Sequence, residues 1–241
     1  MDKLSVLKSY FGYDSFRPGQ EELIDSILSG RDTVGIMPTG GGKSVCFQVP
    51  ALLFPGVTIV VSPLISLMKD QVSALLQNSV PAAYINSAMT PNELRYTLND
   101  TLRGKYKIIY VAPERLLSKS FLEVCSMLFV SLVCVDEAHC VSQWGQDFRP
   151  SYLLIKDFIR TFEKRPVVCA FTATATQRVR EDIVRILQLQ SPLRPLALRR
   201  AGDYHAQTAD PENPSATSLR ARLLCGQDLA PFVPEQTLAV Y

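Results

Sequence analysis

Short apolar runs separated by longer helical stretches are the feature that most constrains the fold of this sequence. The runs are rich in β-branched residues and lack polar alternation, which predicts strands covered on both faces of a parallel sheet. These runs span residues 32–37, 57–61, 82–85, 107–111, 132–136 and 167–172. Helices are predicted over residues 18–28 and 177–189, and from Pro91 after the capping-box residue Thr90. The alternation predicts a doubly wound α/β domain that binds ligands at the carboxyl ends of its strands.

The composition changes after Gln190. All nine lysines lie at or before Lys164, whereas residues 191–241 contain five arginines and six of the sixteen prolines. We therefore expect a folded domain over residues 1–190 and an atypical tail over residues 191–241 that is weakly ordered or aberrant, for example an out-of-frame ending.

Charge and hydropathy narrow the class of protein. A net charge of +2 neither requires nor excludes nucleic acid, because a local surface can bind it. The N-terminus lacks the apolar run of a secretory signal, and no stretch approaches the roughly 18 apolar residues of a membrane span. The six cysteines are scattered, with no Cys-x-x-Cys pair, and several lie in apolar runs. We expect buried thiols in a cytoplasmic protein with no membrane partner.

A glycine-rich stretch, GIMPTGGGKS, follows the first predicted strand and precedes a helix. Its three consecutive glycines are Gly40, Gly41 and Gly42. Backbone N–H groups of such a turn converge on an anion, and the helix N-terminus adds its positive dipole. Lys43 would then neutralise phosphates, and the Ser44 hydroxyl would help to hold Mg²⁺. Met37 stands where the strict phosphate-loop pattern has glycine, so a plain glycine turn is the alternative.

An acidic pair, Asp136-Glu137, ends another predicted strand in the stretch LVCVDEAHC. In phosphate-loop hydrolases an acid at this place reaches the metal ion that bridges the phosphates. Two adjacent carboxylates allow Asp136 to hold Mg²⁺ while Glu137 polarises water as a general base. Two acids that merely end a strand are the alternative, but this is disfavoured by the glycine-lysine-serine loop in the same sheet. Together the two stretches predict a site for ATP and Mg²⁺.

Several motifs occur in the order that is found in superfamily-two helicases. They are MPTGGGKS (37–44), VVSPLISLMKDQV (60–72), YVAPERL (110–116), DEAH (136–139) and FTATAT (171–176). More narrowly, FGYDSFRPGQEELI (11–24) and HCVSQWGQDFRPSY (139–152) resemble the RecQ family of DNA helicases. The resemblance covers residues 1 to about 189. It implies a RecA-like first motor domain of an ATP-dependent 3′–5′ DNA helicase that acts in recombination and repair.

The resemblance also implies roles for residues outside the two central motifs. Arg17 and Gln20 match the adenine-recognising positions, and a Gln amide both donates to and accepts from an adenine edge. Tyr13 would stack on the base, or alternatively belong to the core. Thr39 matches a position of the phosphate motif. A second set matches nucleic-acid contacts or the relay to a second motor domain: Ser62, Lys69, Arg115, Thr172 and Thr174.

The segment from Cys140 to Tyr152 resembles the aromatic-rich loop by which RecQ helicases couple DNA binding to ATP hydrolysis. It contains the only tryptophan of the chain, and its predicted DNA-binding or coupling residues are Trp144, Phe148 and Arg149, with His139 as the link to the acidic pair. Exposed rings suit single-stranded DNA, because each base stacks at about 1–3 kcal/mol. The alternative is a loop whose rings fold into the core. Gln146 departs from the histidine that is common in the family.

A helicase of this kind needs a second motor domain, which supplies an arginine to the transferring phosphate. Residues 191–241 do not resemble that domain, so we expect little ATP turnover and no unwinding of duplex DNA by this polypeptide alone. Two alternatives are a non-motor fragment that binds ATP or single-stranded DNA, and a small phosphate-loop kinase. The kinase is disfavoured because transfer to a small acceptor requires neither the DEAH box nor the aromatic loop.

Overall fold

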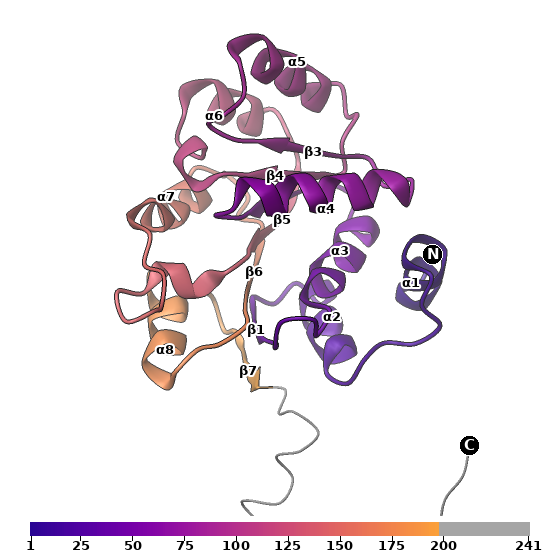
Figure 1. The fold of residues 1–241 in the computed structure, drawn as a ribbon, viewed down its shortest axis with the longest axis vertical. Helices are drawn as coiled ribbons and strands as arrows, with labels where there is room; N and C mark the ends of the chain where they lie inside the picture. The colour runs from indigo at the N-terminus through magenta and orange to yellow at the C-terminus, as the bar shows by residue number, and fades with distance from the viewer. Residues whose placement is uncertain (198–241) are drawn as a thin grey trace, which may run out of the picture. The chain divides into compact units, whose positions relative to one another are not determined.

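A parallel sheet of seven strands organises residues 1–197, which the computed structural model describes (Figure 1). The strands lie in the order β3-β4-β2-β5-β6-β1-β7, and every neighbouring pair is parallel. Their bounds are β1 Thr33–Ile36, β2 Val57–Val61, β3 Ala82–Ile85, β4 Ile108–Val111, β5 Val130–Val135, β6 Val167–Thr172 and β7 Leu193–Ala197. The six predicted strands and the doubly wound parallel sheet are therefore confirmed.

Helices pack on both faces of the sheet, because neighbouring strand residues point to opposite sides. In β5, for example, Val133 belongs to a core shared with α5 to α8, whereas Cys134 belongs to a second core shared with α2, α3 and α4. The helices are α1 Lys3–Phe11, α2 Gln20–Leu28, α3 Lys43–Leu53, α4 Ile65–Gln77, α5 Pro91–Leu102, α6 Lys119–Ser126, α7 Leu154–Arg160 and α8 Gln177–Ile186. None of these helices is long and apolar enough to cross a membrane.

Local signals for the helix ends are confirmed where they are strongest. The Thr90 hydroxyl accepts from the Glu93 N–H while the Glu93 carboxylate accepts from the Thr90 N–H, which completes the predicted capping box at α5. Five cysteines are described, and all five are buried and free, as predicted. Cys225 lies outside the described residues.

The sheet extends past residue 190, where the sequence predicts the folded domain to end. Strand β7 pairs with β1, and the preceding Gln190 N–H donates to the buried Asp32 carboxylate at 2.6 Å. Pro195 of β7 lies on an edge strand of the sheet, where the missing N–H of a proline is tolerated. The rest of the predicted tail, residues 198–241, lies outside the described part of the chain.

The strand order brings three distant loops to one edge of the sheet. Strands β5, β6 and β1 are neighbours, so the segments that follow their carboxyl ends lie side by side. These segments are the glycine loop after β1, the acidic pair after β5 and the Thr172-Ala-Thr174 motif after β6.

Candidate nucleotide site and aromatic loop

The glycine loop adopts a backbone that side chains resist. Gly40 and Gly42 have φ angles of 77° and 80°, in the left-handed region that favours glycine. A Cβ on Gly41 would lie 2.8 Å from the Pro38 carbonyl oxygen, and one on Gly42 would overlap the Gln20 amide. Gly42 also caps α3, so Lys43 is the first residue of that helix. The loop thus presents a helix N-terminus next to open backbone, which is the arrangement that binds phosphate.

Gln20, the first residue of α2, and Arg17, which precedes that helix, hold this loop. The Gln20 amide, which is buried, donates to the carbonyl oxygen of Gly42 at 3.1 Å and accepts from the Arg17 N–H at 2.8 Å. The Arg17 guanidinium donates to the Gly40 carbonyl oxygen at 2.5 Å. The sequence predicts adenine recognition for Arg17 and Gln20. In this structure the polar atoms of Gln20 contact the loop backbone, and the role in adenine binding stays a prediction.

Lys43 and the acidic pair meet across the carboxyl edge of the sheet. The Lys43 ammonium lies 3.1 Å from Glu137, and both side chains are largely buried. The other oxygen of Glu137 lies 3.3 Å from Nδ1 of His139. That same ring nitrogen lies 2.8 Å from the Thr172 hydroxyl, which donates to the Thr174 carbonyl oxygen at 3.1 Å. A continuous line of polar contacts therefore joins the glycine loop to the Thr172-Ala-Thr174 motif.

The two carboxylates have opposite electrostatic environments. Burial, followed by the nearby Glu137 charge, raises the pKa of Asp136 to about 6. Hydrogen bonding to His139, and then the charge of Lys43, lowers the pKa of Glu137. The Cys140 sulfur beside Nε2 and the Glu137 carboxylate raise the pKa of His139 to about 9. Glu137 is thus an ionised acid held between two cations, whereas Asp136 is a buried carboxylate that lacks a cationic partner among the described residues.

Glu137 also has a backbone that a non-glycine residue rarely adopts. Its φ and ψ angles are both 47°, in the left-handed region. The neighbouring Asp136 carbonyl oxygen accepts a hydrogen bond at 2.9 Å from the buried Tyr152 hydroxyl. Such strain persists only where the surroundings fix it, and it gathers at functional sites. Tyr152, at the end of the 139–152 motif, was not predicted as a site residue.

The residues present fit a nucleotide with Mg²⁺. Phosphate needs open N–H groups and a cation, which the glycine loop and Lys43 provide. Mg²⁺ takes oxygen ligands, and Ser44, one residue into α3, and Asp136 carry the oxygens for it. Thr39 is exposed within the loop. Tyr13 is 51% exposed, so the interpretation of Tyr13 as a core residue is wrong, and stacking on a base stays a prediction.

The aromatic loop projects its tryptophan outward. Trp144 is 61% exposed, which contradicts the alternative that its ring folds into the core. Phe148 is half-buried. Arg149 donates to the Pro63 carbonyl oxygen at 2.8 Å, so it joins this loop to the segment after β2. A pocket of about 310 Å³ opens beside the loop. His139, Trp144 and Thr174 are among its lining residues.

The other residues predicted near DNA lie along the same edge of the sheet. Lys69 is exposed on α4, and Arg115 is half-buried, with Nε donating to the Asn86 carbonyl oxygen at 3.2 Å. Ser62 is buried, and its hydroxyl has no hydrogen-bond partner within residues 1–197.

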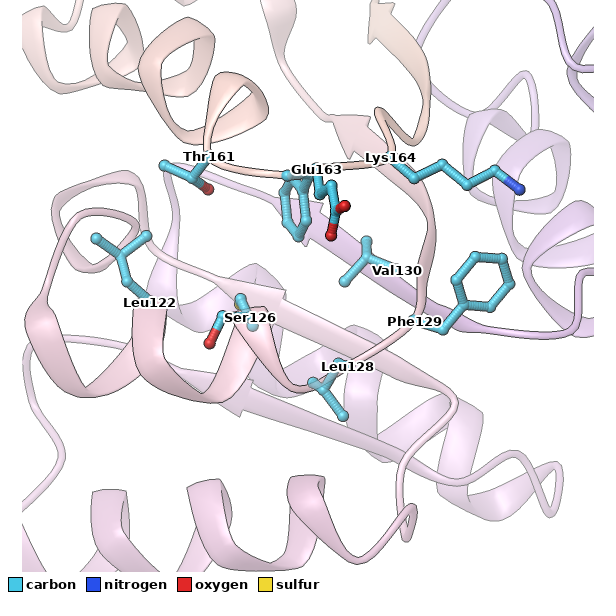
Figure 2. Close-up of a pocket in the computed structure, with 10 residues that line it drawn as sticks. Leu122, Ser126, Leu128, Phe129, Val130, Thr161, Glu163 and Lys164 are labelled. Atoms are coloured by element: carbon cyan, nitrogen blue, oxygen red, sulfur yellow. The ribbon is translucent and has the colours of Figure 1, made fainter.

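A larger pocket lies at the opposite end of the strands. Its volume is about 440 Å³, and it is lined by Phe129, Val130, Glu163 and Lys164 among others (Figure 2). Val130 begins β5 and Lys164 precedes β6, so this pocket is at the amino ends of these strands. It contains none of the predicted site residues. The pocket beside the aromatic loop, although smaller, is lined by the predicted site residues His139, Trp144 and Thr174.

Comparison with protein families identifies the class. The family model described as DEAD/DEAH box helicase matches residues 17–183, which include the glycine loop, the acidic pair and the Thr172-Ala-Thr174 motif. The chain belongs to this family, and membership implies nucleotide binding. Within this family, the chain is similar to three curated relatives that are named ATP-dependent DNA helicase RecQ. The proteins of Bacillus subtilis, Pasteurella multocida and Haemophilus influenzae are 52%, 51% and 47% identical over 77–78% of this chain. The chain spans about a third of the length of these relatives.

Solved helicase structures share the fold at low sequence identity. A structure described as a hypothetical ATP-dependent RNA helicase from Sulfolobus tokodaii has a TM-score of 0.60 and 21% identity, covering 79% of this chain and 56% of that chain. The DUF1998 helicase MrfA bound to DNA has a TM-score of 0.63 and 18% identity, covering 81% of this chain and 29% of that chain. The sheet of residues 1–197 is thus a RecA-like helicase fold, as the resemblance implied.

Proposed function

We propose that this chain is the ATP-binding motor domain of a RecQ-type DNA helicase and that its site binds ATP with Mg²⁺. The single observation that carries the proposal is the 3.1 Å contact between Lys43 and Glu137, which are 94 positions apart. The contact brings together, at the N-terminus of α3, the lysine that would bind phosphate and the acid that would act as general base. A glycine turn without function has no need of a largely buried carboxylate opposite its lysine.

The roles of the charged groups follow from their environments. Lys43 would exchange part of its contact with Glu137 for phosphate oxygens, and Ser44 and Asp136 would hold Mg²⁺. Bound Mg²⁺ neutralises charge on the phosphates and orients them. Glu137, kept ionised by His139 and Lys43, would accept a hydrogen bond from the attacking water and then its proton.

Single-stranded DNA is the second ligand in this proposal. The exposed Trp144 offers a stacking surface that tolerates any base. Arg149, whose guanidinium pairs with Asp147 at 2.8 Å and donates to the Pro63 carbonyl oxygen, would hold the loop in place. His139 contacts Glu137 and Thr172 and lines the same pocket as Trp144, so it would be the side chain through which a change at the loop reaches Glu137. Coupling of hydrolysis to 3′–5′ movement requires a second motor domain that completes the cleft.

Replacing Glu137 by Gln tests the role of the general base. The amide retains the shape of the carboxylate but cannot take a proton, so the affinity for a fluorescent ATP analogue with Mg²⁺ should remain within a few-fold of the parent value. Turnover of labelled ATP, at whatever rate the parent shows with single-stranded DNA, should fall by about 10²- to 10⁴-fold. Unchanged turnover in Glu137→Gln would assign the base to another residue.

Replacing Lys43 by Ala tests the phosphate loop separately. Loss of a charge-assisted contact to phosphate should weaken binding of the ATP analogue by about 10- to 100-fold. This variant breaks the largely buried pair with Glu137, but Glu137 keeps His139 as a partner, so the midpoint of urea unfolding should fall only modestly. Lys69→Ala, on α4, is the matched control because Lys69 is exposed, and it should bind the analogue like the parent. Parental affinity in Lys43→Ala would contradict the nucleotide site.

A further inference from the structure

Arg178 covers one face of the Trp144 ring. The carbon at the centre of its guanidinium group lies 3.6 Å from the centroid of the ring, which is stacking distance. Arg178 belongs to the first turn of α8, which begins soon after the Thr172-Ala-Thr174 motif. The sequence does not predict this contact, because residues 144 and 178 lie on separate segments. Both side chains are exposed, so the stack is held by the two groups themselves rather than by a surrounding core.

A second pair of contacts fastens the same loop to the same helix. The fully buried Ser142 hydroxyl donates to Asp182 at 2.7 Å and accepts from the Trp144 N–H at 3.2 Å. Asp182 is held in turn by Arg185, 2.5 Å away. The backbone of Trp144 is therefore fixed through Ser142, whereas the orientation of its indole depends on Arg178.

The position of the indole matters because the ring forms part of a pocket wall. The pocket of about 310 Å³ is lined by Trp144 and Gln146 from the loop, by Thr174 and Thr176 from the segment before α8, and by Val179 of α8, among others. This pocket is large enough for the ring of a single nucleobase. Arg178 is not among the residues that line the pocket, so the guanidinium contacts the indole from outside that space.

We propose that Arg178 is a positioning residue for nucleic acid: it holds the Trp144 ring in place before a base of single-stranded DNA stacks there. The proposal rests on the proposed function of the aromatic loop and adds a residue from α8 to it. A ring that is already held loses less freedom when a base binds, so preorganisation improves affinity. Because α8 follows Thr172 and Thr174 in the chain, the same contact joins the stacking surface to the motif that touches His139.

The geometry distinguishes holding the ring from attracting phosphate. A guanidinium is planar and stacks on an aromatic face, whereas an ammonium is a compact charge that can make only a point cation–π contact. Arg178→Lys therefore retains the positive charge while it removes the stack. Arg178→Ala removes both. Arg95→Ala is the matched control, because Arg95 is another exposed arginine over an exposed ring, Tyr96, on α5.

The first measurement needs no DNA. Trp144 is the only tryptophan of the chain, so time-resolved fluorescence anisotropy reports the motion of this ring alone. Fast motion of the indole should increase in Arg178→Ala and in Arg178→Lys, and should match the parent in Arg95→Ala. Unchanged motion in both Arg178 variants would overturn the proposal.

The second measurement is the affinity of the full chain for a labelled oligothymidylate. Loss of the planar stack of Arg178 on Trp144 corresponds to a decrease of about two- to fivefold, expected in both Arg178 variants. Affinity for the ATP analogue should stay at the parent value, which confirms an intact fold. Parental DNA affinity in Arg178→Lys with a loss only in Arg178→Ala would make Arg178 a phosphate contact and overturn positioning. If the parent itself fails to bind DNA, the DNA part of the proposed function fails too. If the parent binds DNA and both Arg178 variants bind it with the same affinity, the inference about Arg178 alone fails.

Discussion

Asp136 shows at the scale of one residue how a ligand site works against stability. Its carboxylate is 9% exposed, and its one hydrogen bond among the described residues is accepted from the Glu137 N–H at 3.0 Å. Burial and the charge of Glu137 disfavour its ionised form, which raises its pKa to about 6. A group with a raised pKa in the folded state stabilises the fold when protonated. That stabilisation is complete below the unfolded pKa of about 4 and is lost as the pH rises through about 6.

Asp136→Asn should therefore stabilise the nucleotide-free protein at neutral pH. An amide does not titrate, so the variant avoids a loss of about 2–3 kcal/mol that the parent undergoes between about pH 4 and 7. Urea unfolding across this range should show a stability difference that shrinks as the pH falls. Asp157→Asn, at a half-exposed side chain on α7, should show no such trend. A variant less stable than the parent at neutral pH would mean that ionised Asp136 is favourable in the fold. Nucleotide binding in the presence of Mg²⁺ should weaken at the same time.

At the scale of the element, the start of α3 depends on backbone rather than on a capping side chain. Gly42 occupies the cap with a φ angle of 80°, and no side chain accepts from the first turn. The Gln20 amide fills the place where a Cβ of residue 42 would point. The helix thus begins with free N–H groups toward the glycine loop, which a Ser or Asp cap would have occupied.

Gly42→Ala should lower the free energy of unfolding for two separable reasons. The left-handed backbone costs a non-glycine residue about 1–2 kcal/mol, and overlap with Gln20 adds about 1–3 kcal/mol. Gly104→Ala isolates the first cost, because Gly104 has a φ angle of 72° and no atom lies within 4 Å of the place that the added methyl group would take. In urea unfolding, the free energy of unfolding should be lower for Gly42→Ala than for Gly104→Ala. Equal losses of unfolding free energy in the two variants would contradict the overlap, because they would show that the Gln20 side chain moves aside without an energetic cost.

At the scale of the whole described domain, one buried carboxylate joins three segments at the amino end of the sheet. Asp32, which precedes β1 and is 2% exposed, pairs with Arg165 at 2.6 Å and accepts from the Val168 N–H of β6 at 2.9 Å. It also accepts from the Gln190 N–H before β7. The register of β1 against both neighbours is therefore supported by a single side chain.

Asp32→Ala should destabilise the domain by about 3 kcal/mol, because a buried pair is broken and two backbone N–H groups lose their acceptor. The midpoint of urea unfolding should fall accordingly. Asp157→Ala is the matched control: its pair with Arg160, at 3.6 Å, is half-exposed, and its loss should cost less than about 1 kcal/mol. A loss at Asp32 no larger than in this control would contradict the central role of Asp32.

Features encoded over a few consecutive residues were predicted by the sequence itself. The six strands, the Thr90 capping box, and the glycine loop and acidic pair at strand ends follow from periodicity and short motifs. Tertiary structure alone decided which distant side chains meet. Lys43 reaches Glu137 because β1, β6 and β5 are neighbours in the sheet. The residue pattern of a single strand does not specify which strands lie beside it. The pairing of β7 with β1, the use of Gln20 to hold the loop and the stack of Arg178 on Trp144 depend in the same way on contacts between segments far apart in the chain. Such contacts follow from how whole elements pack, whereas local patterns specify only the elements.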